Sequence, residues 1–161
     1  MKKEEPCDYI AYTDGSANNL SPYGEGGSAY IIIKEGRIIH SASKALIGTT
    51  NNRAELLAIM SAVNWIPAGG SVEVHTDSQY CINMLRNITR PLSKDTINLS
   101  LIERYRAIAK HRRVVFVKVK GHSGNMYNEM ADRMAGARTE EMRKSRGIPL
   151  YNIHNSPKVK H

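Results

Sequence analysis

The order of strand-like and helix-like segments constrains the fold of this chain more than any other feature. Branched, aromatic and alternating side chains predict strands over residues 9–14, 28–34 and 37–43. The short Glu35-Gly36 turn joins the last two strands into a hairpin. A cap-like cluster at residues 49–52 then precedes a helical repeat over residues 53–66.

The second half of the chain alternates strands with helices. We expect strands over residues 71–76 and 114–119, and helices over residues 78–87, around 101–109 and from 125 to about 143. A hairpin makes neighbouring strands antiparallel, whereas a strand–helix–strand succession makes them parallel. We therefore predict an α/β fold with a five-stranded mixed sheet, three antiparallel strands followed by parallel ones, flanked by helices.

The length of 161 residues suits one compact domain. We assign residues 1–146 to this domain and residues 147–161 to a loose or extended C-terminal tail, because the tail shows no periodicity. In open sheets with parallel strands, functional sites lie at the carboxyl ends of those strands. Candidate residues are therefore sought there.

Composition excludes several other classes of protein. The longest apolar run is residues 29–33, far short of the ~20 residues of a membrane span, and residues 1–6 lack the apolar core of a secretory signal. Two cysteines, Cys7 and Cys81, cannot form a disulfide framework or a zinc site of cysteines. We expect a cytoplasmic protein in a reducing compartment, with no membrane partner.

Positive charge is concentrated in one segment. Residues 84–120 contain ten Lys and Arg residues but only Asp95 and Glu103 as acids, which accounts for the whole net charge of +8. Such a segment favours a polyanionic partner, because phosphates exchange counterions for Lys and Arg. A solvated basic face without a partner is the alternative.

Two aspartates end strands that we expect to be parallel neighbours. Asp14 stands in Thr-Asp-Gly-Ser and Asp77 in Thr-Asp-Ser-Gln, each after a predicted strand. Each alone could cap a turn or helix. Two helix caps have no reason to share the preceding Thr, however, so we expect the two carboxylates to meet at one edge of the sheet.

Two further acids lie on the apolar faces of predicted helices. Glu55 lies on the stripe of Ala58, Ile59 and Ala62, where an unpaired anion is costly. Arg53 is poorly placed to pair with Glu55, because residues two apart face different directions. Asp132 shares a face with Asn128, Ala131 and Ala135 and is predicted to point inward; an ion pair with Arg133 or Arg138 is the alternative.

Four motifs follow one another along the chain: Thr-Asp-Gly-Ser at 13–16, Asn-Asn-Arg-Ala-Glu-Leu at 51–56, Thr-Asp-Ser-Gln-Tyr at 76–80, and Gly-His-Ser-Gly at 121–124 with Asn-Glu and Ala-Asp after it. In this order they resemble type 1 ribonuclease H, from about residue 9 to residue 138. The resemblance implies that the metal-binding carboxylates are Asp14, Glu55, Asp77 and Asp132. It also implies that His122 assists proton transfer or product release.

The resemblance implies an endoribonuclease that cuts the RNA strand of RNA–DNA hybrids. Two Mg²⁺ ions, for which Mn²⁺ can substitute, would act at the carboxylates and leave 5′-phosphate and 3′-hydroxyl ends. It further implies that Asn51, Asn52 and Gln79 contact the minor groove, where 2′-hydroxyls distinguish RNA from DNA. Thr50 and Asn51, with Asn18 or Asn19, match a pocket for a phosphate of the DNA strand; some of these side chains also fit helix caps.

The chain departs from many bacterial members in its basic region. Their tryptophan-containing protrusion is absent or shortened here, since the only tryptophan is Trp65 on an earlier helix, and Arg86, Arg90 and Lys94 supply charge in the corresponding region. A non-catalytic hybrid-binding module of the same fold is the alternative function. Transposases, integrases and resolvases share the sheet architecture but leave the Gly-His-Ser-Gly motif unexplained. A domain released from a reverse transcriptase is a further alternative; we expect a stand-alone monomer.

Overall fold

The structure is a computed structural model that describes residues 5–120 and 124–151. Its five strands are β1 (Tyr9–Ala17), β2 (Gly26–Lys34), β3 (Arg37–Leu46), β4 (Ser71–Thr76) and β5 (Arg113–Lys118). Its helices are α1 (Asn51–Trp65), α2 (Gln79–Leu85), α3 (Leu99–Ala109) and α4 (Met126–Ser145). These elements follow the order predicted from the sequence.

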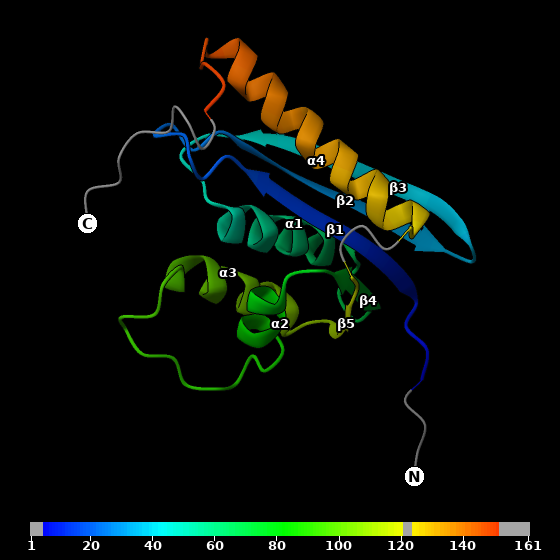
Figure 1. Ribbon diagram of the computed structural model, residues 1–161. Coiled ribbons are helices and arrows are strands. Elements are labelled where there is room, and N and C mark those ends of the chain that lie inside the picture. The colour runs from blue at the N-terminus through cyan, green and yellow to red at the C-terminus, as the bar shows by residue number, and fades with distance from the viewer. Residues whose placement is uncertain (1–4, 121–123, 152–161) are drawn as a thin grey trace.

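The strands form one sheet in the order β3-β2-β1-β4-β5 (Figure 1). The β1–β2 and β2–β3 pairs are antiparallel, whereas the β1–β4 and β4–β5 pairs are parallel. The predicted mixed sheet is confirmed. Strand β1 is central, so it belongs to both the antiparallel and the parallel half.

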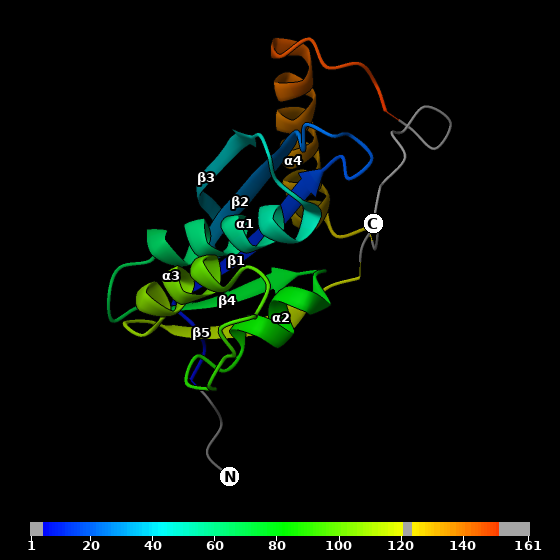
Figure 2. The same ribbon diagram turned by 90° about the vertical axis from the view of Figure 1, so that its left-hand side faces the viewer.

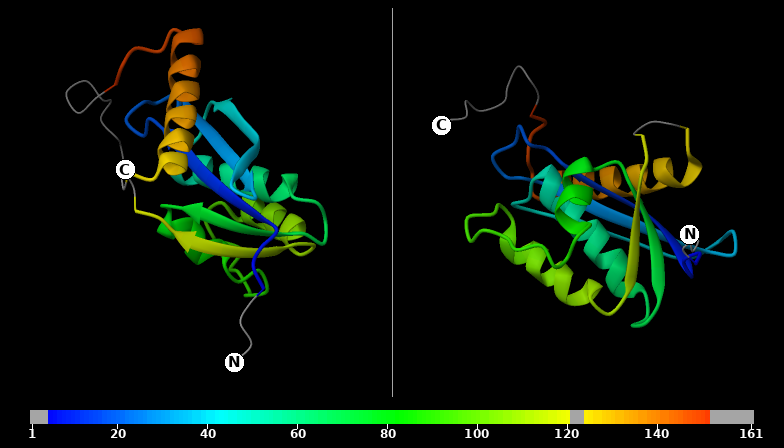
Figure 3. Two further views of the ribbon diagram at one scale, coloured as in Figure 1. Left: turned by 90° about the vertical axis from the view of Figure 1, so that its right-hand side faces the viewer. Right: turned by 90° about the horizontal axis from the view of Figure 1, so that it is seen from below.

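Helices cover the two faces of the sheet unequally. Helix α4 packs across β1, β2 and β3, whereas α1 packs on the other face against β1 and β2 with α2 and α3 beside it (Figures 2 and 3). The alternation along β2 fits this arrangement: Ile32 belongs to the core under α1, whereas Ile31 and Ile33 belong to the core under α4. Among the described residues, no helix combines the length and the apolar character needed to cross a membrane.

The connection between β1 and β2 is shorter than the sequence predicts. The predicted strands end at residue 14 and resume at residue 28, but Gly15 pairs with Ser28 and Ala17 pairs with Gly26, so the ladder continues beyond Asp14. Glycine is required here because α4 packs closely against the strand. A Cβ atom on Gly27 would lie 2.2 Å from the carbonyl oxygen of Ala135, so α4 rests directly on the backbone of β2.

The segment after α4 folds back toward the sheet. Gly147 has a φ of 64°, and the backbone N–H of Ile148 donates to the carbonyl of Arg143 at 2.9 Å. Arg143 Nη1 donates in return to the carbonyl of Ile148 at 3.0 Å, and Ile148 is buried. Residues 147–151 therefore lie against the end of the domain, and a boundary at residue 146 stays a prediction.

Candidate active site

Three carboxylates from three separate elements converge at one edge of the sheet. Asp14 lies on β1, Glu55 in α1 and Asp77 directly after β4, and one oxygen of each lies within 4.8 Å of the others. The carboxyl ends of β1 and β4 and the start of α1 face the right-hand side of Figure 2. The predicted meeting of Asp14 and Asp77 is therefore present, and Glu55 completes the group.

Gly15 allows α1 to approach β1 closely enough to form this group. A Cβ atom at this position would lie 2.2 Å from the backbone nitrogen of Glu55 and 2.3 Å from the carbonyl carbon of Ala54. Real Cβ atoms essentially never approach backbone so closely. The glycine after Asp14 thus places the first turn of α1 directly against the strand.

Hydrogen bonds fix the start of α1 relative to the end of β1. Thr50 caps the helix by accepting from the N–H of Arg53 at 3.2 Å. Asn51 Oδ1 accepts from the N–H of Ala17 at 2.8 Å, and the N–H of Asn51 donates to Asn19 Oδ1 at 3.3 Å. The cap-like side chains therefore also tie the helix to β1 and its following loop.

The turn that carries Asp77 is held by its neighbours. Thr76 Oγ1 accepts from the N–H of Ser78 at 3.1 Å, and Ser78 Oγ caps α2 by accepting from the N–H of Cys81 at 3.1 Å. Ser78, rather than Asp77, is therefore the helix cap. The Asp77 carboxylate is left available to the acidic group.

Burial makes this acidic group electrostatically unusual. Asp14 and Glu55 are both buried, and desolvation raises the pKa of Asp14 to about 7 and the pKa of Glu55 to about 10. The two carboxyls also share a hydrogen bond that lowers the pKa of Asp14 and raises that of Glu55. Protonated Glu55 therefore donates to Asp14, since two adjacent buried anions repel each other.

The donor set fits a hard divalent cation. Glu55 Oε2 is buried and has no hydrogen-bond partner. None of the ion pairs among the described residues involves Asp14, Glu55 or Asp77, and Arg53 instead donates to Asn98 Oδ1 at 3.1 Å. Carboxylate oxygens are the ligands that Mg²⁺ and Mn²⁺ prefer. A bound cation would compensate the carboxylates that no described basic residue neutralises.

Asp132 lies beside this group but is not buried in it. Its helical neighbours Asn128, Ala131 and Ala135 are buried, as expected, whereas Asp132 itself is exposed, so the prediction of an inward-pointing side chain is wrong. Asp132 nevertheless forms a side-chain hydrogen bond with Asp14. The alternative pairing with Arg138 is absent, because Arg138 pairs with Glu141 at 2.8 Å. His122 lies outside the described residues.

A sequence model of the RNase H family, described as RNase H, matches residues 6–140. The chain belongs to the RNase H family. It is therefore identified as a nuclease. Among similar proteins, the ribonuclease H of Rhodopseudomonas palustris strain TIE-1 is 34% identical over 157 residues, covering 91% of this chain and 99% of the relative. The ribonuclease H of Clostridium botulinum strain Hall is 32% identical over 142 residues, covering 82% of this chain and 95% of the relative.

Solved structures share the fold of this RNase H. The crystal structure of LC11-RNase H1 in complex with RNA/DNA hybrid matches with a TM-score of 0.67 at 24% identity, covering 83% of this chain and 98% of that chain. A second structure, of LC11-RNase H1 isolated from compost by a metagenomic approach, matches with a TM-score of 0.68 at 24% identity. It covers 85% of this chain and 99% of that chain. At this identity the likeness establishes the fold.

The polar residues expected to bind nucleic acid gather around the start of α1 in this RNase H. A polar pocket of about 390 Å³ lies between the β1–β2 loop and the segment before α1. It is lined by Asn18, Asn19, Ser21, Pro22, Tyr23, Gly24, Gly48, Thr49 and Thr50. Asn51 and Asn52 are exposed in the adjoining first turn. The structure therefore brings Asn18, Thr50 and Asn51 together.

The remaining predicted contacts lie on and after α2. Gln79 is exposed at the start of this helix, and its Nε2 donates to Asn83 Oδ1 at 2.8 Å. Arg86 and Arg90 are exposed beyond its end, and the carbonyl of Arg90 accepts from Arg106 Nη1 at 2.8 Å. Lys118 was counted only as basic charge, but its Nζ donates to the carbonyl of Asp77 at 2.7 Å. Lys118 lies opposite Thr76 in the β4–β5 register, so only the pairing of these two strands places it beside Asp77.

Proposed function

We propose that this RNase H hydrolyses the RNA strand of RNA–DNA hybrids and leaves 5′-phosphate and 3′-hydroxyl ends. The observation that carries the proposal is the convergence of Asp14, Glu55 and Asp77 at the carboxyl edge of the sheet. The family membership supports it. So does the similar fold of a protein whose structure contains an RNA/DNA hybrid.

The acidic group is proposed to hold two Mg²⁺ ions, with Mn²⁺ able to substitute. Asp14 and Glu55 would supply buried oxygen ligands, Asp77 would supply a more accessible one, and Asp132 would add an exposed one from α4. Bound ions of this kind supply Lewis-acid chemistry for phosphodiester hydrolysis. The unpartnered Glu55 Oε2 is a ready ligand atom.

The surrounding side chains are proposed to select and position the hybrid. Asn51, Asn52 and Gln79 carry amides that can both donate to and accept from 2′-hydroxyls. The polar pocket with Asn18 and Thr50 would take a phosphate of the DNA strand, because it opens beside the N-terminus of α1 and this helix has no acid in its first turn.

Other groups are assigned by charge and by resemblance. Arg86 and Arg90 are exposed and would contact backbone phosphates near α2. His122 is proposed to assist proton transfer or product release. We further propose that the protein acts as a monomer in the cytoplasm.

The direct test is cleavage of an end-labelled RNA–DNA hybrid with Mg²⁺, Mn²⁺ or EDTA, beside single-stranded RNA and duplex RNA. Asp77→Asn removes one carboxylate of the acidic group, and Glu103→Gln removes an exposed acid on α3 as a matched control. We expect metal-dependent cutting of the RNA strand of the hybrid alone, lost in Asp77→Asn and retained in Glu103→Gln.

Product ends and binding complete this test. A 5′-phosphate is shown by ligation to an acceptor with a free 3′-hydroxyl. Hybrid binding without cutting in either metal would reject the proposed reaction and favour the non-catalytic module. Cutting of duplex RNA at a similar rate would reject the proposed substrate.

A further inference from the structure

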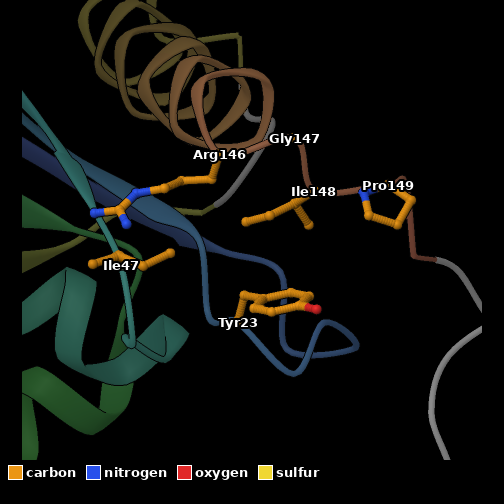
Figure 4. Close-up of a pocket in the computed structure, with 6 residues that line it drawn as sticks. All are labelled: Tyr23, Ile47, Arg146, Gly147, Ile148 and Pro149. Carbon is orange, nitrogen blue, oxygen red and sulfur yellow. The ribbon is translucent and has the colours of Figure 1, made fainter.

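A second pocket adjoins the polar pocket at the end of the domain. It has a volume of about 300 Å³ and is lined by Tyr23, Ile47, Arg146, Gly147, Ile148 and Pro149. In Figure 4, Tyr23 and Ile47 form one wall, and Arg146 and Ile148 form the opposite wall. Three segments distant in the sequence therefore build it: the β1–β2 loop, the end of β3 and the segment after α4.

The side chains around this pocket are unusually exposed for their apolar character. Tyr23 is 52% exposed and Ile47 is 44% exposed, and Leu20 and Leu150 are exposed in the same segments. The ring of Tyr151 lies 6.4 Å from that of Tyr23. Gathered exposed aromatic and aliphatic groups mark a binding surface more often than an isolated exposed residue does.

The charge of this surface is positive. Arg138 and Arg143 of α4 pair with Glu141 and Glu140, but Arg146 has no ion pair among the described residues. None of the described residues that line the pocket is acidic. An anionic ligand is therefore favoured over a cationic one.

Tyr23 connects this surface to the polar pocket, because it lines both. The carbonyl of Tyr151 also accepts from Asn18 Nδ2 at 3.4 Å, so the C-terminal segment is attached to the loop that lines the polar pocket. The two adjoining pockets match the two parts of a nucleotide: the polar pocket suits its phosphate, and the aromatic, cationic pocket suits its base. Bases stack on aromatic rings and on guanidinium groups.

We propose that Tyr23, Tyr151 and Arg146 form a stacking platform for an unpaired nucleotide of the DNA strand where it leaves the hybrid. The bases within a duplex are stacked on one another, so only an unpaired base can lie on these rings. The inference rests on the proposed function, since it extends the path of the DNA strand beyond the polar pocket. It predicts a preference for hybrids flanked by single-stranded DNA.

The experiment measures binding by fluorescence anisotropy in EDTA, so that no hydrolysis occurs. The ligands are a blunt hybrid, the same hybrid with a four-nucleotide DNA overhang at either end, and the same overhang without bases. The base-free overhang keeps the phosphates and removes stacking. A DNA duplex with and without the overhang serves as a parallel pair.

The variants separate ring, charge and general effects. Tyr23→Ala removes the ring, Tyr23→Phe keeps it, and Arg146→Gln removes the guanidinium. Lys144→Gln is the matched control, since Lys144 is a nearby exposed cation that does not line the pocket. Both Tyr23 and Arg146 are exposed, so these changes leave the core intact.

We expect one overhang to tighten binding by about tenfold, the gain typical of one stacked base. The gain should fall to less than twofold for the base-free overhang and in Tyr23→Ala, fall in Arg146→Gln, and persist in Tyr23→Phe and Lys144→Gln. The proposal is overturned if neither overhang tightens binding, if the base-free overhang gives the same gain, or if Tyr23→Ala retains it.

Failure of the proposed function is distinguishable from failure of this inference. Cleavage of the blunt hybrid does not require an overhang, so it tests the function alone. The gain measured on the DNA duplex requires no cleavage and no hybrid, so it tests the platform alone.

Discussion

Asp14 and Glu55 hold protons in the folded protein that the unfolded chain releases at lower pH. Burial raises the pKa of both carboxyls above their ordinary values, to about 7 and about 10. In the metal-free protein, the free energy of unfolding must therefore fall as pH rises from about 4 through these values, because the folded state binds more protons than the unfolded state.

Thermal unfolding in EDTA at pH 5 and pH 8 checks this expectation. The wild-type protein should be less stable at pH 8, and Glu55→Gln should flatten the difference, which we expect to be about 1–4 kcal/mol. Adding Mg²⁺ at pH 8 should restore stability to the wild type by mass action. If wild type and Glu55→Gln showed the same pH dependence of stability, the raised pKa of Glu55 would not be its cause.

Glu25 is a third buried acid; it lies directly before β2 and does not belong to the acidic group. It is 0% exposed, and neither of its carboxyl oxygens has a hydrogen-bond partner. Unpartnered buried polar groups cost free energy. We expect Glu25→Met, which keeps the volume, to raise the free energy of unfolding by about 1–3 kcal/mol.

Urea unfolding measures this change, with Glu103→Gln as the exposed control. Glu25→Gln should give a smaller gain, since it removes the charge but not the polarity. A loss of stability in Glu25→Met would mean that the carboxyl has a stabilising partner.

The positions of single site residues were predictable where they belong to a recognisable motif. Strand order predicted that Asp14 and Asp77 meet, helical spacing placed Glu55 on the face toward the sheet, and the resemblance joined the three in one group, which is present in the structure. The burial of Asp132 was wrong, because helical spacing gives the face of a residue but not the position where that face leaves the sheet. The metal-binding roles, and that of His122, stay predictions. Tyr23 and Arg146 belong to no motif, and only the fold brings them together.

At the scale of elements, the contact between β1 and α1 depends on Gly15. A methyl group there would meet the backbone of Glu55 and Ala54, which is not free to move like a side chain. We expect Gly15→Ala to separate strand and helix, lower stability by about 2 kcal/mol or more, and reduce hybrid cleavage at least about tenfold.

Gly136→Ala is the matched control for this substitution. Gly136 lies within α4, and a Cβ atom there would meet nothing within 4 Å, so alanine should add about 1 kcal/mol of stability. Calorimetry and a cleavage assay on both variants provide the measurement. Wild-type activity in Gly15→Ala would show that the acidic group tolerates a wider spacing.

Element boundaries were less predictable than the elements themselves. Strand β1 extends to Ala17 because β2 pairs with it, and this long-range pairing is invisible in a local pattern. Helix α3 begins after Asn98, which has a φ of 63° and makes no side-chain cap bond. The Asn98 side chain instead accepts from Arg53 and donates to Tyr80, so long-range contacts accompany this boundary as well.

At the scale of the molecule, the segment after α2 concentrates exposed basic groups. If Arg86 and Arg90 contact phosphates, replacing both with Gln should reduce the slope of log K against log salt concentration for hybrid binding by about 2. The control is the double replacement of Lys34 and Arg37, beside the β2–β3 turn, which lies far from α2 in Figure 1. An equal change in both variants would indicate a diffuse charge effect.

The architecture itself was the most predictable feature, because the order of strands and helices leaves few sheets to choose from. The positions of Asp14 and Asp77 after their strands then indicated which edge carries the acidic group.

The central position of β1 also bears on when the protein becomes active. Asp14 is made before the parallel partner of β1, which follows only after the hairpin and α1, and the helix that covers β1, β2 and β3 follows all of these strands. A nascent chain therefore exposes Asp14 and Glu55 without a finished sheet around them. Nuclease activity therefore begins only after α4 has left the exit tunnel, and a nascent chain that still lacks α4 cannot cut nucleic acid.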